Sequence, residues 1–158
     1  MNKPKKNIHV VKAQQLHIID LANRIKREDV DEGMASHGMT VEQGLKFSLR
    51  FSSDAYTVVV DGVPEMIFGV CPSHGSSATI WMMSSEEVFT LVSRKRFLRE
   101  TKKYVTLFHK KYAELYNHVS EKNLRSLDWL RKVGFKFTNR VPNYGVAGLP
   151  FIRVESRV

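Results

Sequence analysis

The chain has 158 residues and one cysteine, and 42% of its residues are hydrophobic. These values predict a single soluble domain over residues 1–158, and the lone Cys71 excludes an internal disulfide. No apolar run approaches the roughly 18–20 residues that a membrane-spanning helix needs, so no membrane span is expected.

The charge is distributed unevenly along the chain. The net charge is +9. Residues 13–93 carry five basic and eleven acidic residues, whereas residues 94–111 carry eight basic residues and one acidic residue. Residues 1–7 are predicted to form a flexible basic tail in which Lys3, Lys5 and Lys6 fray. The electrostatic field of such an uneven, basic charge distribution favours acidic partners, either nucleic acid or an acidic protein.

The first half predicts a strand, three helical segments and a hairpin. The strand is expected at 8–11 and the helices at 14–26, from 27 to Gly38, and after Thr40. Thr40 and Gln43 have the spacing of a capping box, in which the threonine side chain accepts from the backbone N–H of residue 43. Strands at 56–60 and 63–70 flank Asp61-Gly62, and Asp-Gly between alternating apolar runs is typical of a tight hairpin.

The middle of the chain predicts a central strand followed by a basic helix. Residues 78–83 are apolar throughout, as in a strand buried on both faces. Residues 84–87 read as a helix start. Residues 94–112 predict a surface helix that lays an apolar stripe on the sheet. The stripe comprises Phe97, Leu98, Thr101, Tyr104, Val105, Phe108 and Tyr112.

The C-terminal part predicts a strand, a helix and two more strands. Residues 115–119 are extended. Asn123 is an expected N-cap, and Gly134 ends the helix in a left-handed conformation. Trp129 and Leu130 fall on the apolar side of this helix and are expected in the core. Strands follow at 135–138 and around Pro150-Phe151, and the whole order makes a mixed α/β domain.

This order, with the spacing N-x2-S-x6-V-G-F that begins at Asn123, resembles the N-acetyltransferase (GNAT) fold. The chain resembles more closely the internal virion protein A family of T-seven-like podophages, whose members are distant relatives of that fold. The segments that carry the resemblance are Arg27-x-Asp29-x-x-Glu32, Ser36-x-Gly38, Gly44-Leu45, residues 58–70, residues 84–87 after Trp81, residues 115–135 and Pro150-Phe151.

The resemblance implies a GNAT-like, mostly antiparallel sheet flanked by helices. It also implies a protein of the phage virion interior, present in the host cytoplasm during infection, whose partners are other phage virion proteins. In an active member of the fold, Asn123 and Ser126 would contact acyl-coenzyme A.

Two departures from the active enzymes set the functional expectation. Residues 83–99 contain no glycine where those enzymes have a glycine loop for the pyrophosphate, and they contain Glu86 and Glu87 instead. Leu130 stands where many members have a tyrosine that protonates the leaving thiolate; Tyr116 and Tyr144 are the available substitutes. The sequence therefore favours a degenerate, non-catalytic fold that needs no cofactor. The alternative is an active N-acetyltransferase that uses acetyl-coenzyme A.

The remaining polar groups favour structural roles, and no catalytic residue is assigned. Asp29 and Glu32 are expected as a solvated pair in the first turn of a helix, with a general base as the alternative. The six histidines show no metal-binding spacing, and Cys71 is expected as a buried thiol. The basic helix is expected to be a solvated face or a protein-docking surface, with DNA as the weaker alternative. That surface comprises Lys95, Arg99, Lys102, Lys103, Lys110 and Lys111.

Overall fold

Seven strands form one mixed sheet in the computed structural model, which describes residues 4–158. Their spatial order is β1-β2-β3-β4-β5-β7-β6, and every neighbouring pair is antiparallel except β4 and β5. The strands are β1 (Ile8–Lys12), β2 (Asp54–Val60), β3 (Val63–Pro72), β4 (Ser77–Ser84), β5 (Glu114–Ser120), β6 (Lys136–Tyr144) and β7 (Leu149–Arg157).

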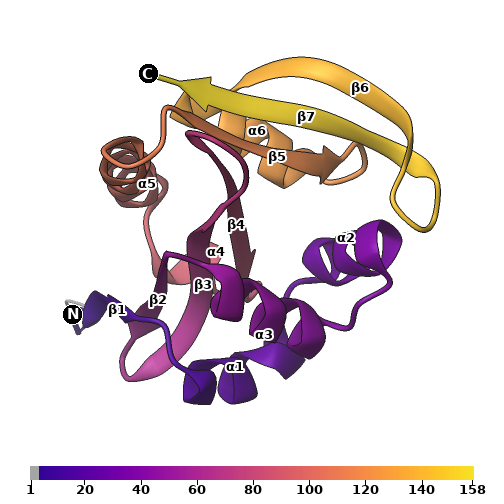
Figure 1. The fold of residues 1–158 in the computed structure, drawn as a ribbon. Helices are drawn as coiled ribbons and strands as arrows, with labels where there is room; N and C mark the ends of the chain where they lie inside the picture. The colour runs from indigo at the N-terminus through magenta and orange to yellow at the C-terminus, as the bar shows by residue number, and fades with distance from the viewer. Residues whose placement is uncertain (1–3) are drawn as a thin grey trace.

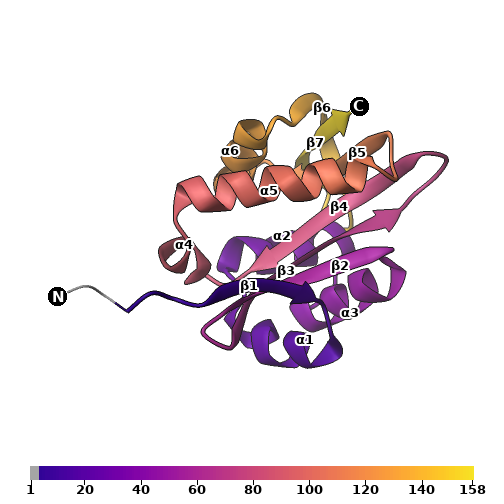
Figure 2. The same cartoon turned by 90° about the vertical axis from the view of Figure 1, so that its left-hand side faces the viewer.

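The helices cover both faces of this sheet. They are α1 (Gln15–Leu21), a 3₁₀ turn η1 (Ala22–Arg24), α2 (Arg27–His37), α3 (Val41–Phe51), α4 (Val88–Leu91), α5 (Arg94–His109) and α6 (Leu124–Val133). Helix α5 lies across one face (Figure 2), and α1 and α3 lie on the opposite side (Figure 1). The mixed α/β architecture expected from the sequence, a mostly antiparallel sheet flanked by helices, is therefore confirmed.

Alternate residues of β3 serve the two faces, as the pleat of a strand requires. Ile67 packs with Ile18, Leu21 and Leu45 beneath α1 and α3. Val70 packs instead with Phe108 of α5 and with part of α6. The apolar run of β3 is thus explained by burial on both sides.

The local signals in the sequence are mostly confirmed. Thr40 and Gln43 form the capping box, and Asn123 caps α6 by accepting from the N–H of Ser126. The expected helix at 14–26 is shorter, because Ile25 leaves helical geometry to form a bridge with Ser85. The helix predicted to start at 84–87 begins at Val88, where the Ser85 hydroxyl accepts from the Val88 N–H.

The expected basic tail lies partly outside the described residues, since these exclude Lys3. Residues 4–7 are exposed and belong to no helix or strand. Asn7 donates its N–H to the Asp61 carboxylate at 2.9 Å, and the Asp61 N–H donates to the Asn7 carbonyl at 2.8 Å. The end of this segment is therefore held beside the β2–β3 turn.

Gly134→Val should destabilise the protein more than reversing charges on α5. Gly134 has φ of 111°, and a Cβ there would meet nothing within 4 Å, so the cost is backbone strain of roughly 1–2 kcal/mol or more for a β-branched residue. Lys102 and Lys103 are exposed, so Lys102→Glu with Lys103→Glu should cost at most about 0.5 kcal/mol per site. Urea unfolding of both variants measures the difference; a larger loss in the lysine variant would contradict the expectation.

Candidate functional site

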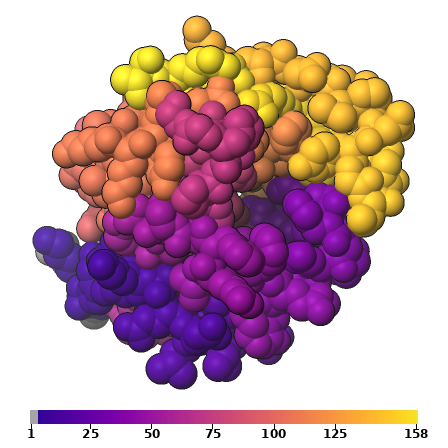
Figure 3. All heavy atoms as spheres, in the orientation of Figure 1, coloured from indigo at the N-terminus to yellow at the C-terminus, as the bar shows by residue number. Residues whose placement is uncertain are grey.

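Strands β4 and β5 pair over a short stretch and then diverge. Ser77–Thr79 pairs in parallel with Glu114–Tyr116, and the Asn117 side chain then donates to the Ile80 carbonyl at 2.7 Å. Beyond that bond the two strands splay apart (Figure 1). The space-filling view shows a crevice between the N-terminal half, in indigo to purple, and the C-terminal strands, in orange to yellow (Figure 3).

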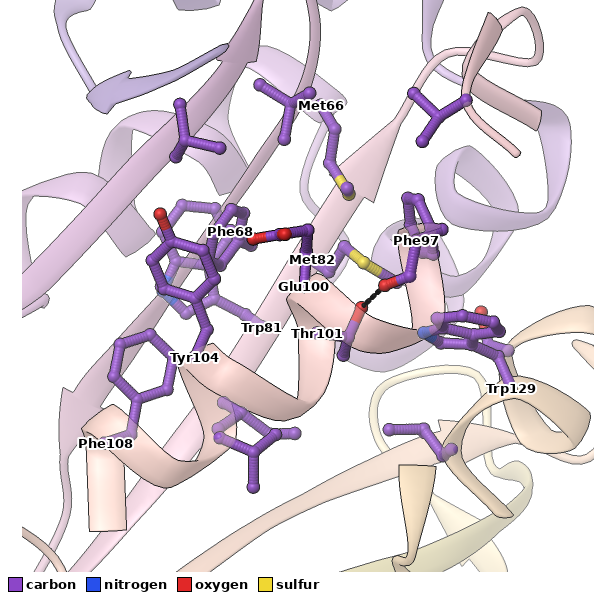
Figure 4. Close-up of a pocket in the computed structure, with 18 of the residues that line it drawn as sticks. Met66, Phe68, Trp81, Met82, Phe97, Glu100, Thr101, Tyr104, Phe108 and Trp129 are labelled. Atoms are coloured by element: carbon purple, nitrogen blue, oxygen red, sulfur yellow. Dashed lines mark hydrogen bonds between the residues drawn. The ribbon is translucent and has the colours of Figure 1, made fainter. Parts of the chain in front are cut away.

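A cavity of about 450 Å³ occupies the splay and continues beneath α5. Its volume lies in the range of roughly 300–1,000 Å³ that is usual for ligand sites. Trp81, Met82, Phe97, Tyr104 and Trp129 surround it (Figure 4). Most of its lining is apolar, and its polar side chains include Glu32, Arg96, Asn117 and Ser126.

The β4 edge turns backbone polar groups toward this cavity. The Ile80 carbonyl accepts from Asn117 on β5, and the Ser84 N–H and carbonyl bond to α2. Both residues therefore point their backbone away from β3. In an antiparallel ladder every second residue directs its backbone groups to the same side of the strand. Met82 lies two residues from both Ile80 and Ser84, so its N–H and carbonyl also point toward the gap.

Helix α2 closes the open end of the splay by bonding to both strands. On the β4 side, the Asp29 carboxylate accepts from the Ser84 N–H at 3.2 Å, and the Lys26 N–H donates to the Ser84 carbonyl at 2.9 Å. On the β5 side, the Glu32 carboxylate accepts from the Ser120 N–H and from the Asn123 side chain. These contacts fix one helix across two diverging strands.

The prediction that Asp29 and Glu32 are a solvated pair is wrong. Asp29 is buried and forms an ion pair with the equally buried Lys26. Burial raises the pKa of Asp29, and Lys26 opposes that shift. Glu32 is half-buried as a residue, but its carboxylate is enclosed; burial raises its pKa to about 7 against the hydrogen bonds from Ser120 and Asn123.

Glu32→Gln should flatten the pH dependence of stability. Because the pKa is raised from 4.5 to about 7, the folded state keeps a proton that the unfolded state releases in this interval. The contribution of Glu32 to the free energy of unfolding is therefore fully present below about pH 4.5. It falls by roughly 3 kcal/mol as the pH rises through about 7. Urea unfolding at about pH 5 and about pH 8 tests this. The exposed Glu42→Gln is the control, and identical profiles for wild type and Glu32→Gln would contradict it.

Arg125 links α2, α6 and the segment before α4. Its guanidinium donates to Glu28 at 2.9 and 3.0 Å and to Glu86 at 2.8 and 2.9 Å, and it lies 4.8 Å from the centre of the Phe89 ring. Glu86, one of the two acidic residues that stand where active enzymes have the glycine loop, is thus already paired. The partners are largely exposed, so each pair contributes at most about 1 kcal/mol.

The segment between β4 and α5 uses its amides internally. The Ser85 hydroxyl accepts from the Val88 N–H at 3.2 Å, and the Ser93 hydroxyl accepts from the Arg96 N–H at 3.2 Å. Residues 83–99 contain no glycine, so a phosphate cannot approach the backbone as closely as it does in a glycine loop.

The two residues predicted to contact a cofactor are placed differently. Ser126 lines the cavity, whereas the Asn123 side chain caps α6 through its oxygen and holds Glu32 through its nitrogen. Capping therefore accounts for the bond that the Asn123 oxygen makes, but not for the bond from its nitrogen to Glu32. Sequence reasoning missed this second bond, because the partner of Asn123 is 91 residues away.

Neither of the two substitute tyrosines expected from the sequence lines the cavity. The Tyr116 hydroxyl bonds to Ser73 at 2.6 Å, and Tyr144 stacks between His118 and Phe151. Leu130 packs against the core cluster around Leu127, as expected, and both Leu130 and Trp129 also line the cavity. The tyrosine that does line the cavity is Tyr104 of α5.

The basic side chains of the predicted docking surface are all exposed. They are Lys95, Arg99, Lys102, Lys103, Lys110 and Lys111. Arg99 and Lys103 pair with Glu100, and Lys111 pairs with Asp54 at 2.8 Å. Within residues 4–158, no group of three or more histidine, cysteine or acidic side chains is arranged to hold a metal ion. Each helix of that described part is too short or too polar to cross a membrane.

A sequence profile of the family described as "Bacteriophage T7, probable scaffold protein Gp13" matches residues 57–141, more than half of the chain. The chain belongs to this family. The stretch matched by the Gp13 profile runs from β2 into β6, so it contains both splayed strands, α5 and α6. It does not contain α2 and its buried carboxylates. No curated protein sequence matches the chain.

Solved structures with a similar fold include acetyltransferases. Ard1 from Thermoplasma volcanium has a TM-score of 0.74 at 16% identity, over 96% of this chain and 97% of that one. A GNAT-family acetyltransferase from Bacillus anthracis has a TM-score of 0.70 at 10% identity, over 95% and 94%. AAC(6')-Ib in complex with ribostamycin and coenzyme A has a TM-score of 0.68 at 12% identity, over 95% and 93%. This member of the Gp13 family therefore has a GNAT-like fold.

Proposed function

We propose that the protein is an internal virion protein that acts in virion assembly through contacts of its surface with other virion proteins. The observation that carries this proposal is the match to a phage family described as a probable scaffold protein. The resemblance to internal virion protein A supports the finer placement inside the capsid. The exposed basic face of α5 supplies a surface for an acidic protein partner.

The site supports a non-enzymatic role in two ways. The segment that would hold a pyrophosphate has no glycine and bonds its own amides, and Arg125 at the start of α6 is held by Glu28 and Glu86. Leu130 cannot donate a proton to a leaving group. A fold does not by itself fix an activity, so these departures outweigh the likeness to acetyltransferases.

Quantitative mass spectrometry of purified virions tests this function. The chain should be present in particles, and a deletion mutant should package altered amounts of other internal proteins. Lys102→Glu with Lys103→Glu should fold normally and enter particles less well, whereas the exposed Lys46→Ala on α3 should enter normally. Absence of the chain from particles, with unchanged composition in the deletion mutant, would overturn the proposal.

A second candidate is an acyl-coenzyme A-dependent N-acyltransferase, and the splayed strands with Glu32 beside the cavity favour it. In such a reaction an amine attacks the thioester carbon, the C–N bond forms, the C–S bond breaks, and the amine proton needs an acceptor. A base with a pKa near the working pH is the most effective acceptor, and the pKa of Glu32 is about 7. The thiolate would leave without a tyrosine at position 130 and take its proton from solvent.

Calorimetry with acetyl-coenzyme A separates the two candidates. Micromolar binding, with turnover on an amine that falls by about 10²–10⁴ in Glu32→Gln, would support the enzyme. Absence of binding up to millimolar concentration would remove it and leave the assembly role untouched.

A further inference from the structure

Helix α5 leaves much of its apolar stripe without close contact to the sheet. Phe108 is the one buried residue of this 16-residue helix. At the C-terminal end, Phe108 and Tyr104 pack in an aromatic cluster with Tyr56 and Phe68, and at the other end Phe97 contacts Trp129. Between these two anchored ends lies the part of the cavity that continues away from the splay.

The floor of this part is a continuous apolar surface across four strands. Val10, Val58 and Met66 are cross-strand neighbours on β1, β2 and β3, and Phe68 is the neighbour of Met82 on β4. Three strand spacings make this floor about 14 Å wide. The lining residues of α5 from Phe97 to Phe108 extend over about 16 Å of helix. The cavity therefore extends over about 14–16 Å beneath α5. Two methionines in its floor can adapt to an occupant.

Some polar side chains of this cavity already have partners. The Thr101 hydroxyl donates to the Phe97 carbonyl at 2.7 Å, and the Glu100 carboxylate pairs with Lys103 and Arg99. Among the buried side-chain polar groups that line the cavity, the indole N–H of Trp129 has no hydrogen-bond partner in the described residues. Figure 4 shows the indole nitrogen on the edge of the ring that faces α5 and Thr101. A buried donor without an acceptor costs roughly 1–3 kcal/mol.

We propose that this cavity binds a linear acyl chain much longer than acetyl, with a carbonyl oxygen that accepts from Trp129. The apolar volume accommodates the chain, and the buried indole N–H of Trp129 supplies a donor for one acceptor at its end. The chain could belong to a free fatty acid or to an acyl thioester. The site is separate from the surface that would contact virion proteins.

Binding of dodecanoate and dodecanoyl-coenzyme A, measured by calorimetry and tryptophan fluorescence, tests this site. Trp81 and Trp129 both line the cavity, so an occupant should change their emission. We expect micromolar binding of at least one probe and tighter binding of dodecanoate than of octanoate.

Two substitutions on α5 form a matched pair. Thr101→Leu fills the cavity and should weaken binding about tenfold or more. Thr106→Leu should leave it unchanged, because Thr106 is exposed and makes the same bond to its own helix, to the Lys102 carbonyl at 3.0 Å. Should Thr101→Leu fail to fold, Trp129→Phe serves in its place and should weaken binding several-fold by removing the donor.

The outcomes separate this site from the acyltransferase candidate. Dodecanoate binding without coenzyme A binding supports the site and not the enzyme. If acetyl-coenzyme A binds, dodecanoyl-coenzyme A binds no more tightly and dodecanoate does not bind, the acyl-chain site is wrong while the enzyme stands. Lack of response to both dodecanoyl probes, or equal binding by the two threonine variants, also overturns the proposal.

Discussion

Lys26→Ala is expected to lower the free energy of unfolding by about 3–5 kcal/mol, because it leaves the Asp29 carboxylate buried without its counter-charge. The Lys26 side chain is 2% exposed and that of Asp29 is 4% exposed. Asp29 also accepts from the Ser84 N–H, so it cannot turn away without breaking the link between α2 and β4. Since burial already raises the pKa of Asp29, the loss should shrink as pH falls and the carboxyl takes up a proton.

Two further variants make this expectation specific. Lys26→Met with Asp29→Asn removes both charges and keeps an oxygen for the Ser84 amide, so it should recover most of the loss. Lys46→Ala breaks an exposed pair with Glu42 and should cost less than about 1 kcal/mol. Urea unfolding at neutral pH measures all three. A Lys26→Ala loss as small as that of Lys46→Ala would show that the pair is not desolvated in solution.

The features that were predictable from sequence are those with short-range causes. The capping box at Thr40, the cap at Asn123 and the stop at Gly134 each depend on residues three or four apart. The hairpin at Asp61-Gly62 depends on two residues with positive φ. Because these signals punctuate the whole chain, the order of elements and the fold class followed from them.

The site was less predictable because its contacts are long-range. Asp29 meets Ser84 across 55 positions, and Glu32 meets Ser120 across 88. Charged residues in the first turn of a helix are usually solvated, and nothing local shows that this helix lies across two splayed strands. The available signal was the spacing of Lys26, Asp29, Glu32 and Ser36, which recur every three or four residues and so share one face of the helix.

The cavity beneath α5 escaped prediction for a related reason. Helical periodicity correctly identified the apolar stripe of Phe97, Thr101, Tyr104 and Phe108. It identifies which face turns inward, but not how closely the facing sheet approaches. Here the aromatic contacts at the two ends hold the middle of the helix off the floor.

The tip of the β6–β7 hairpin is the second place where one substitution should have a large effect. The Val146 N–H donates to the Ser36 carbonyl at 3.1 Å, and the Ala147 N–H donates to the Ala35 carbonyl at 3.0 Å. The hairpin tip therefore docks on the C-terminal turn of α2, the helix that closes the splay (Figure 1). Gly145 makes this approach feasible, because a Cβ there would lie 2.5 Å from the Ser36 oxygen and 2.6 Å from its Cα.

Gly145→Ala should therefore cost about 3 kcal/mol or more, combining left-handed backbone strain at φ of 69° with overlap against backbone atoms that cannot turn aside. Gly148→Ala in the same loop is the matched control: its φ is 63°, but an added Cβ meets nothing within 4 Å, so it should cost only about 1–2 kcal/mol. Because the tip holds α2 in place, hydrogen exchange at the Ser120 amide, which donates to Glu32, should speed up in Gly145→Ala more than in Gly148→Ala. Equal losses of stability and equal exchange in the two variants would mean that the hairpin does not hold α2, and that its carboxylates alone close the splay.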